Sequence, residues 1–265
     1  EAVMDKCSEC GGLMKRVGSG TQKVEQELFD LFPKSQVLRM DADTVGASRG
    51  HEALLREFEE KKIPILLGTQ MVAKGLDFEN VTLVGVLDAD LSLYAQNYHA
   101  AERTYSLLAQ VVGRAGRGER PGRAVIQTYH PENEVIQAAA KQDYETFYQN
   151  ELRMRSLRRY PPFADLFTLT VSGLEELRVI AAARTLCDAL RYACSQPPLN
   201  GLEVEVLGPA GAPVVKVNNR YRYCVYLCGK GGSVLRRTVS EYLLAFYARK
   251  ENRGLDIFAD CNALQ

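Results

Sequence analysis

The sequence contains no tryptophan, three histidines and no excess of either charge sign. Lys plus Arg and Asp plus Glu each total 33, so bulk charge gives no indication of nucleic-acid binding. Any such binding would depend on local basic patches. No apolar run approaches the ~20 residues of a membrane-spanning helix, and residues 1–6 lack the basic and apolar regions of a signal peptide. These absences exclude a membrane span and lead us to expect a cytoplasmic protein.

Cysteine is present in an odd number, seven, which does not complete a disulfide framework. Five cysteines are scattered among apolar residues: Cys187, Cys194, Cys224, Cys228 and Cys261. We expect most of these to be reduced core thiols. The other two form the knuckle Cys7-Ser-Glu-Cys10-Gly-Gly, whose glycines allow a tight loop to place two thiolates on one metal. Zinc requires four ligands, and the sequence offers this one CxxC pair. The alternative to a zinc site is therefore that Cys7 and Cys10 are two free thiols.

The chain does not begin with Met, and the knuckle lies within its first ten residues. We therefore expect a piece of a longer protein, in which residues 1–14 are the remnant of a zinc-binding region. The 265 residues, with 46% hydrophobic content, are enough for about two domains.

Between about residues 15 and 130, short apolar runs alternate with amphipathic stretches. A capping box with Ser19 at the N-cap and Gln22 at N3 predicts a helix that runs through Leu31. The other elements expected here are strands at 36–40, 63–67, 81–87 and 124–128 and helices at 50–60 and 98–112. Strands that alternate with helices predict an α/β fold with a parallel sheet and right-handed crossovers.

A second domain is expected from residue 159 to the end. Residues 134–157 predict helix, in one or two pieces, that ends in a basic cluster: Arg153, Arg155, Arg158 and Arg159. Tyr160-Pro161-Pro162-Phe163 ends the helix, because proline donates no backbone N–H and disfavours a helical residue before it. The elements that follow are strand 165–172, helix 175–195, strands 203–208 and 221–229, helix 233–248 and strand 255–259. This order predicts a smaller α+β domain of the ferredoxin-like, split βαβ type.

The segment Gln110-Val-Val-Gly113-Arg114-Ala-Gly116-Arg117 places two arginines three residues apart at the end of a predicted helix. The small residues between them allow both guanidinium groups to point toward one anion, and the glycines allow a facing domain to approach the backbone. Stabilising the charge on a transferring γ-phosphoryl group is chemistry that needs such a pair. The alternative is a glycine-rich turn with solvated arginines.

A second segment, Gly68-Thr69-Gln70-Met-Val-Ala-Lys74-Gly75-Leu-Asp77-Phe78, directly follows the predicted strand 63–67. It therefore lies at the carboxyl end of a strand, where α/β sheets bind ligands. Thr69, Gln70 and Lys74 can reach phosphates of a nucleic-acid backbone, and Asp77 can accept a hydrogen bond from a ribose hydroxyl. The alternative is an ordinary strand-to-helix loop with a glycine turn.

Together these two segments resemble motifs V and VI of superfamily 2 helicases, and their particular residues are similar to those of the bacterial primosomal replication-restart helicases. Gly18-Ser-Gly20-Thr21 resembles motif IV of the same family. Further matching segments are 81–90, 101–103, 127–128 and 160–163. The similarity runs from Cys7 to the C-terminus, and it is weakest after residue 165.

The resemblance implies that residues 15–158 form the second RecA-like motor lobe, which closes ATP against a first lobe. It implies that Arg114 and Arg117 are arginine fingers and that Gln110 is a catalytic glutamine on the nucleotide side. It further assigns Gly75 and Asp77 to ATP binding, and Thr69 to DNA contact. Thr21, in motif IV, is a second expected DNA contact.

For residues 159–265, the resemblance implies a domain that binds forked or single-stranded DNA and docks the single-stranded DNA-binding protein. Arg220, Tyr221 and Arg222 are the expected DNA contacts, because arginine neutralises phosphate and an exposed ring stacks on a base. The alternative is a strand with its tyrosines inward and its arginines solvated. The ending Ala259-Asp260-Cys261-Asn262 departs from the Asp-x-Asp-Pro of the family.

The sequence has no GxxxxGK[ST] phosphate loop and no Asp-Glu-x-His box. It therefore supplies no lysine for the β- and γ-phosphates and no hydroxyl for Mg²⁺, and we expect the chain alone not to hydrolyse ATP. Cys7 and Cys10 match the last of four CxxC pairs that hold two zinc ions in the family.

The function expected for the whole protein is an ATP-dependent 3′-to-5′ DNA helicase that recognises stalled forks, drives primosome assembly and acts as a monomer. A non-catalytic DNA- and partner-binding module is the alternative. Another superfamily 2 motor is the third hypothesis.

Overall fold

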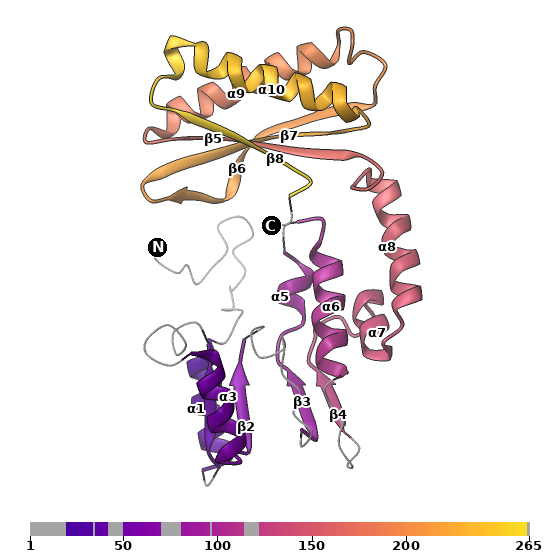
Figure 1. The fold of residues 1–265 in the computed structure, drawn as a ribbon, viewed down its shortest axis with the longest axis vertical. Helices are drawn as coiled ribbons and strands as arrows, with labels where there is room; N and C mark the ends of the chain where they lie inside the picture. The colour runs from indigo at the N-terminus through magenta and orange to yellow at the C-terminus, as the bar shows by residue number, and fades with distance from the viewer. Residues whose placement is uncertain are drawn as a thin grey trace, which may run out of the picture. The chain divides into compact units, whose positions relative to one another are not determined.

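The computed structural model describes residues 20–33, 35–41, 50–69, 81–95, 97–113 and 122–263 (Figure 1). The chain divides into two compact units. The N-terminal unit comprises Glu1–Ala95 and Ala101–Tyr144, and the C-terminal unit comprises Gln96–Ala100 and Glu145–Gln265. Within the described residues, no helix is both long and apolar enough to cross a membrane.

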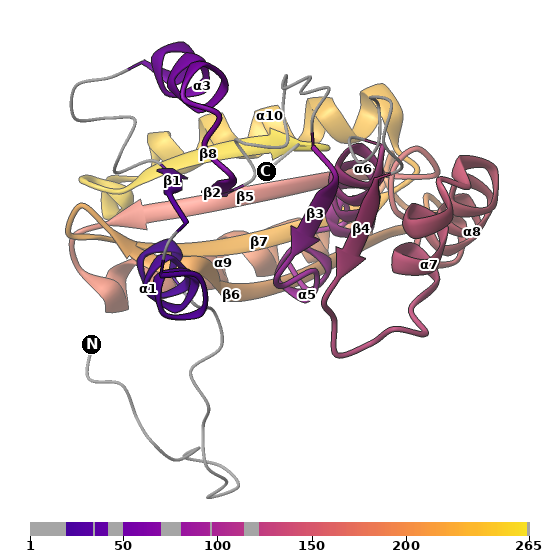
Figure 2. The ribbon, with the colours of Figure 1, turned by 90° about the horizontal axis from the view of Figure 1, so that it is seen from below.

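The first half of the N-terminal unit is a pair of parallel strands with two helices: α1 Thr21–Leu31, β1 Val37–Met40, α3 His51–Glu60 and β2 Ile65–Gly68. Figure 2 shows α1 and α3 on opposite sides of the strand pair. The two strands are in register from Val37 opposite Ile65 to Met40 opposite Gly68. Met40, which is fully buried, anchors this pair. The parallel arrangement predicted from the alternating pattern is confirmed.

The start of α1 differs from the prediction. Gly20, not Ser19, occupies the N-cap, and it makes no side-chain capping bond. Ser19 lies outside the described residues. The first helical residue, Thr21, instead turns its hydroxyl toward the residue that follows β1, Asp41.

The second half of the unit is another parallel pair, with helices: β3 Leu83–Val86, α5 Asp90–Leu93, α6 Ala100–Val112, β4 Arg123–Ile126 and α7 Glu134–Lys141. Helix α6 buries Thr104, Tyr105 and Leu108 on one face, at the spacing of successive helical turns. Helix α7 is capped by Asn133, whose side chain accepts hydrogen bonds from two backbone N–H groups of the first turn. It ends at Gln142, which has a left-handed φ of 55°.

The C-terminal unit begins again within α8 (Tyr144–Arg158), at Glu145. After α8 the chain forms a split βαβ domain, as predicted. Its elements are β5 Asp165–Gly173, α9 Glu176–Cys194, β6 Val204–Val217, β7 Arg220–Gly229, α10 Gly232–Ala248, the 3₁₀ turn η1 Lys250–Asn252 and β8 Asp256–Cys261. The four strands form one antiparallel sheet in the order β6-β7-β5-β8. Helices α9 and α10 cover one face of it (Figure 1).

Alternation along the strands builds the core between the sheet and the helices. Phe167, Leu169 and Val171 of β5 are buried on the helix side. They pack with apolar residues of both helices: Val179, Ala183, Leu186, Leu190, Leu235, Val239 and Phe246. Burying each large aliphatic side chain contributes about 1.5–3 kcal/mol, so this layer holds the unit together.

Strand β6 is longer than the predicted 203–208, because it continues through two register shifts against β7. The first shift falls at Gly208, which has a φ of 105°. A Cβ at this position would lie 2.9 Å from the Cys224 carbonyl oxygen, so only glycine fits there. The second shift, between Gly211 and Lys216, leaves extra residues on β6.

The predicted domain boundary between residues 158 and 159 stays a prediction. In the structure, the division between the two compact units falls at Tyr144, and the short segment 96–100 belongs with the second unit.

All five cysteines that the structure describes are free. Cys187 and Cys224 are buried, as expected, whereas Cys194 and Cys228 are half-buried and Cys261 is exposed. Burial raises the pKa of the Cys187, Cys194 and Cys228 thiols. These thiols therefore stay protonated and weakly nucleophilic at neutral pH.

Candidate functional site

The carboxyl edge of β1 and β2 brings two predicted DNA contacts together. Because Met40 pairs with Gly68, the next residues on the two strands, Asp41 and Thr69, emerge at the same edge. The Thr21 hydroxyl donates to the Asp41 carboxylate at 2.5 Å. Thr21 and Thr69, 48 residues apart in sequence, thus both belong to the edge where α/β sheets bind ligands.

Asp41 holds this edge in place. It is 5% exposed, and its Oδ2 also lies 3.1 Å from Nε of Arg39. Arg39 in turn binds Glu25 of α1 at 2.9 Å. The first turns of α1 are therefore tied to the end of β1 by a partly buried charge network, which fixes the position of Thr21.

The carboxyl edge of β3 and β4 is pinned by another buried carboxylate, Asp90. Its two oxygens accept hydrogen bonds from the Thr128 hydroxyl at 3.0 Å and the Tyr129 N–H at 2.9 Å. The Thr104 hydroxyl of α6 donates to Ser92 of α5 at 3.1 Å. Asp90 and Thr128 lie in two of the matching segments, 81–90 and 127–128, but the sequence indicates no role for either residue. The structure shows that they join the residues after the two strands.

Gln110 lies half-buried in the last turn of α6, close to the start of the arginine segment. The Gly113 N–H donates to the Ala109 carbonyl at 2.9 Å, and the Gln142 side-chain amide reaches the same carbonyl at 3.4 Å. A Cβ on Gly113 would lie 2.9 Å from the Gln142 side-chain nitrogen. The end of α6, one residue before Arg114, is thus held by the residue that ends α7.

Eight of the predicted site residues lie outside the described residues: Cys7, Cys10, Gln70, Lys74, Gly75, Asp77, Arg114 and Arg117. Their metal, ATP and DNA roles stay predictions. Among the residues that the structure does describe, no group of three or more His, Cys, Asp or Glu could hold a metal ion.

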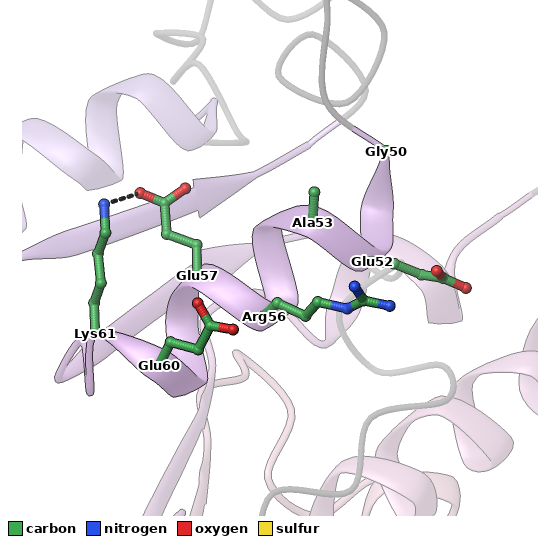
Figure 3. Close-up of a pocket in the computed structure, with 7 residues that line it drawn as sticks. All are labelled: Gly50, Glu52, Ala53, Arg56, Glu57, Glu60 and Lys61. Carbon is green, nitrogen blue, oxygen red and sulfur yellow. Dashed lines mark hydrogen bonds and ion pairs between the residues drawn. The ribbon is translucent and has the colours of Figure 1, made fainter.

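An open hollow of about 540 Å³ lies along α3, and none of the predicted site residues lines it (Figure 3). Its charged lining consists of three carboxylates, Glu52, Glu57 and Glu60, and two cations, Arg56 and Lys61. Lys61 is bound to Glu57 at 2.8 Å. The excess of carboxylates disfavours a phosphate ligand at this surface.

In the C-terminal unit, the predicted aromatic contact Tyr221 packs inward. Tyr221 and Tyr223 are partly buried against the core. The Lys216 ammonium lies 4.7 Å from the centre of the Tyr221 ring. The Tyr223 hydroxyl donates to Glu176 at 2.9 Å, and this hydrogen bond, with burial, raises the pKa of Tyr223. Of the two arrangements left open by the sequence, the structure has the tyrosines inward.

The neighbouring arginines are bound to their own sheet. Arg220 donates to the Ser172 hydroxyl at 3.1 Å and the Ser172 carbonyl at 3.2 Å, and it forms an ion pair with Asp256. Arg222 donates twice to the Val214 carbonyl, at 3.1 and 2.8 Å. These bonds give both arginines a structural role, and their contact with DNA stays a prediction.

Comparison with known proteins finds two matched domains, one in each half of the chain. Residues 17–119 match the helicase conserved C-terminal domain, a RecA-like lobe, and residues 156–262 match the primosomal protein N C-terminal domain. The replication restart protein PriA of Bacillus subtilis (strain 168) is 42% identical over 263 residues, which is 99% of this chain and 32% of that protein.

Two further relatives bear the same name. PriA of Synechocystis is 42% identical over 82% of this chain and 26% of its own length, and PriA of Rickettsia conorii is 36% identical over 85% and 34%. The chain therefore spans about a third or less of the relatives that it matches.

Proposed function

We propose, because the chain belongs to the same family as the PriA replication restart proteins, that it is the second motor lobe and C-terminal domain of an ATP-dependent 3′-to-5′ DNA helicase. The whole protein would act at stalled forks and drive primosome assembly. The observation that carries the proposal is the order of the two matched domains, with 42% identity to a replication restart protein over 99% of the chain. Its partners would be forked and single-stranded DNA and the single-stranded DNA-binding protein.

The role proposed for the N-terminal unit depends on the carboxyl edge of β1 and β2 and on the end of α6. Thr69 emerges at the carboxyl edge of β1 and β2, where its hydroxyl can donate to a DNA phosphate. The Thr21 hydroxyl, which donates to Asp41, would have to leave that carboxylate before it could do the same. Arg114 and Arg117 follow directly on the fastened end of α6 and would neutralise charge on the γ-phosphoryl group of ATP. The phosphate-binding lysine and the Mg²⁺ ligand must come from another lobe, because this sequence has no phosphate loop. Cys7 and Cys10 would supply two ligands of a zinc site that the longer protein completes.

The test is the substitution Arg114→Ala in the full-length protein, assayed for unwinding of a forked duplex and for fork binding. Removing an arginine finger costs on the order of 10³–10⁵ in the rate of phosphoryl transfer, so unwinding should be lost while fork affinity is kept. Arg56→Ala, which removes an exposed arginine of α3 from the same lobe, serves as the matched control and should unwind normally. Unwinding at the wild-type rate by the Arg114→Ala protein would refute the finger assignment.

A further inference from the structure

The turn that leads from α9 into β6 contains the one Asn-Gly pair of the sequence, Asn200-Gly201. The Leu202 N–H donates to the Leu199 carbonyl at 2.9 Å, which closes a four-residue turn with Asn200 and Gly201 at its centre. Gly201 has a φ of 91°, whereas Asn200 does not have a positive φ. This combination is the geometry of a type II turn, whose third position favours glycine because φ is positive there.

Both ends of this turn are anchored to the C-terminal unit. Leu199 is 1% exposed and belongs to the core between the sheet and the helices, and Leu202 packs against the same core. The N–H groups of Leu199 and Asn200 both donate to the Gln196 carbonyl, at 3.0 and 2.8 Å. The backbone on either side of the central peptide therefore has a fixed path.

The central peptide of the turn, in contrast, is open to solvent. Asn200 is exposed, and in the part of the chain that the structure describes neither its side-chain amide nor the Gly201 N–H has a hydrogen-bond partner. A type II turn uses the N–H of its fourth residue and leaves that of the third residue unused. A Cβ on Gly201 would meet no atom within 4 Å, so this side of the turn is unobstructed.

We propose that Asn200-Gly201 is a site of spontaneous deamidation. The Gly201 peptide nitrogen attacks Cγ of Asn200, and a new N–Cγ bond forms. The bond from Cγ to the side-chain nitrogen breaks, and that nitrogen takes up the proton of the Gly201 N–H and leaves as ammonia. The product is a five-membered succinimide ring. Water then adds to either of its two carbonyl groups and opens the ring, which gives aspartate or isoaspartate.

Glycine at position 201 favours this reaction over the same reaction at other asparagines. The ring closes only when the peptide rotates until its nitrogen reaches Cγ of the asparagine, and a Cβ on the following residue hinders that rotation. The crowding that a Cβ causes in restricted backbone conformations corresponds to about tenfold in rate. The glycine that the type II turn favours therefore also makes Asn200 reactive.

The other asparagines of the C-terminal unit provide the contrast. Asn218 and Asn219 are exposed in the turn between β6 and β7, but each is followed by a residue that has a Cβ. The Asn252 side chain donates to the Phe246 carbonyl at 2.7 Å, and the Asn262 side chain is bound to Leu166 and Asp165. An amide held in this way cannot turn toward the next peptide nitrogen.

Deamidation changes both the charge and the backbone of the turn. Aspartate at position 200 adds a negative charge three residues before Glu203, in a chain whose formal net charge is zero. Isoaspartate carries the main chain through the former side chain, which lengthens the backbone by a methylene group between the anchored residues Leu199 and Leu202. The isoaspartate form should therefore be less stable than the unmodified chain.

The experiment incubates this chain at physiological temperature in mildly alkaline buffer and follows each asparagine by peptide mapping with mass spectrometry. Asn200 should convert about tenfold faster than Asn218 and Asn219, because only Asn200 precedes a glycine. Asn252 and Asn262 should stay unmodified over the same period. Conversion of Asn200 at a rate no higher than that of Asn218 would overturn the proposal.

Asn200→Gln is the matched control. It keeps the amide and the charge of the turn, but its longer side chain would have to close a six-membered ring, which forms more slowly. Before incubation its urea midpoint of unfolding should equal that of the wild-type chain. After incubation the midpoint of the wild-type chain should fall as isoaspartate accumulates, and that of the Asn200→Gln chain should not. An equal fall in both chains would overturn the assignment of this loss to Asn200-Gly201.

Discussion

The substitution Arg220→Ala tests whether the arginine at the start of β7 stabilises its own sheet. Arg220 makes two hydrogen bonds to Ser172, a 7%-exposed residue, and one ion pair to Asp256. The ion pair is worth under ~1 kcal/mol, because its side chains are 33% and 63% exposed. Losing the two bonds to Ser172 costs about 1 kcal/mol more, since water replaces part of them. The expected loss of unfolding free energy is therefore about 1–2 kcal/mol.

The assay is urea unfolding of this chain, with amide exchange at β5 and β7 reporting on the sheet. Arg220→Lys keeps the positive charge but loses the two hydrogen bonds to Ser172. This variant should therefore recover only the stability that comes from the ion pair with Asp256, which is the part that 1 M salt screens. If the Arg220→Ala chain and the wild-type chain had the same urea midpoint of unfolding, the structural role of Arg220 would be refuted. Weaker fork binding with unchanged stability would show that the side chain is used for DNA instead.

Two more changes probe the C-terminal core and its pH dependence. Leu169→Ala, at a fully buried site, should lower the unfolding free energy by about 2–5 kcal/mol, whereas Leu177→Ala, at an 82%-exposed site, should cost under ~0.5 kcal/mol; equal urea midpoints would contradict the core. The pKa of Tyr223 is raised by its hydrogen bond to Glu176, so the stability from this bond is present below pH ~10 and is lost as the pH rises through the raised pKa. The wild-type Tm should therefore fall more steeply between pH 9 and 11 than that of Tyr223→Phe, and parallel curves would disprove the linkage.

Much of the fold follows from local patterns that the sequence displays directly. The strands at 36–40 and 124–128 and the split βαβ order were predictable, because apolar alternation and chain breaks at Pro161 and Pro162 are local signals. The N-cap was misplaced by one residue, since Ser19 and Gly20 both suit that position and only tertiary contacts of Thr21 decide between them.

Contacts between distant segments were not predictable from these signals. The Tyr98 hydroxyl meets Asn262 across 164 residues, and no periodicity links the two. The alternation of arginine and tyrosine at the start of β7 predicts that the two residue types lie on opposite faces of the sheet. It does not predict which face the helices cover. The structure decides this, because Tyr221 and Tyr223 pack on the core and Arg220 reaches Ser172 on the other face.

Steady-state ATP hydrolysis in the presence of forked DNA tests the central claim, that this chain carries arginine fingers but no nucleotide cradle. It should be measured for this chain alone, for the full-length protein, and for the full-length protein with Arg114→Ala and Arg117→Ala together. The account predicts that, of these three proteins, only the unmodified full-length protein hydrolyses ATP. DNA-stimulated hydrolysis by the isolated chain, or an unchanged rate in the double variant, would contradict it.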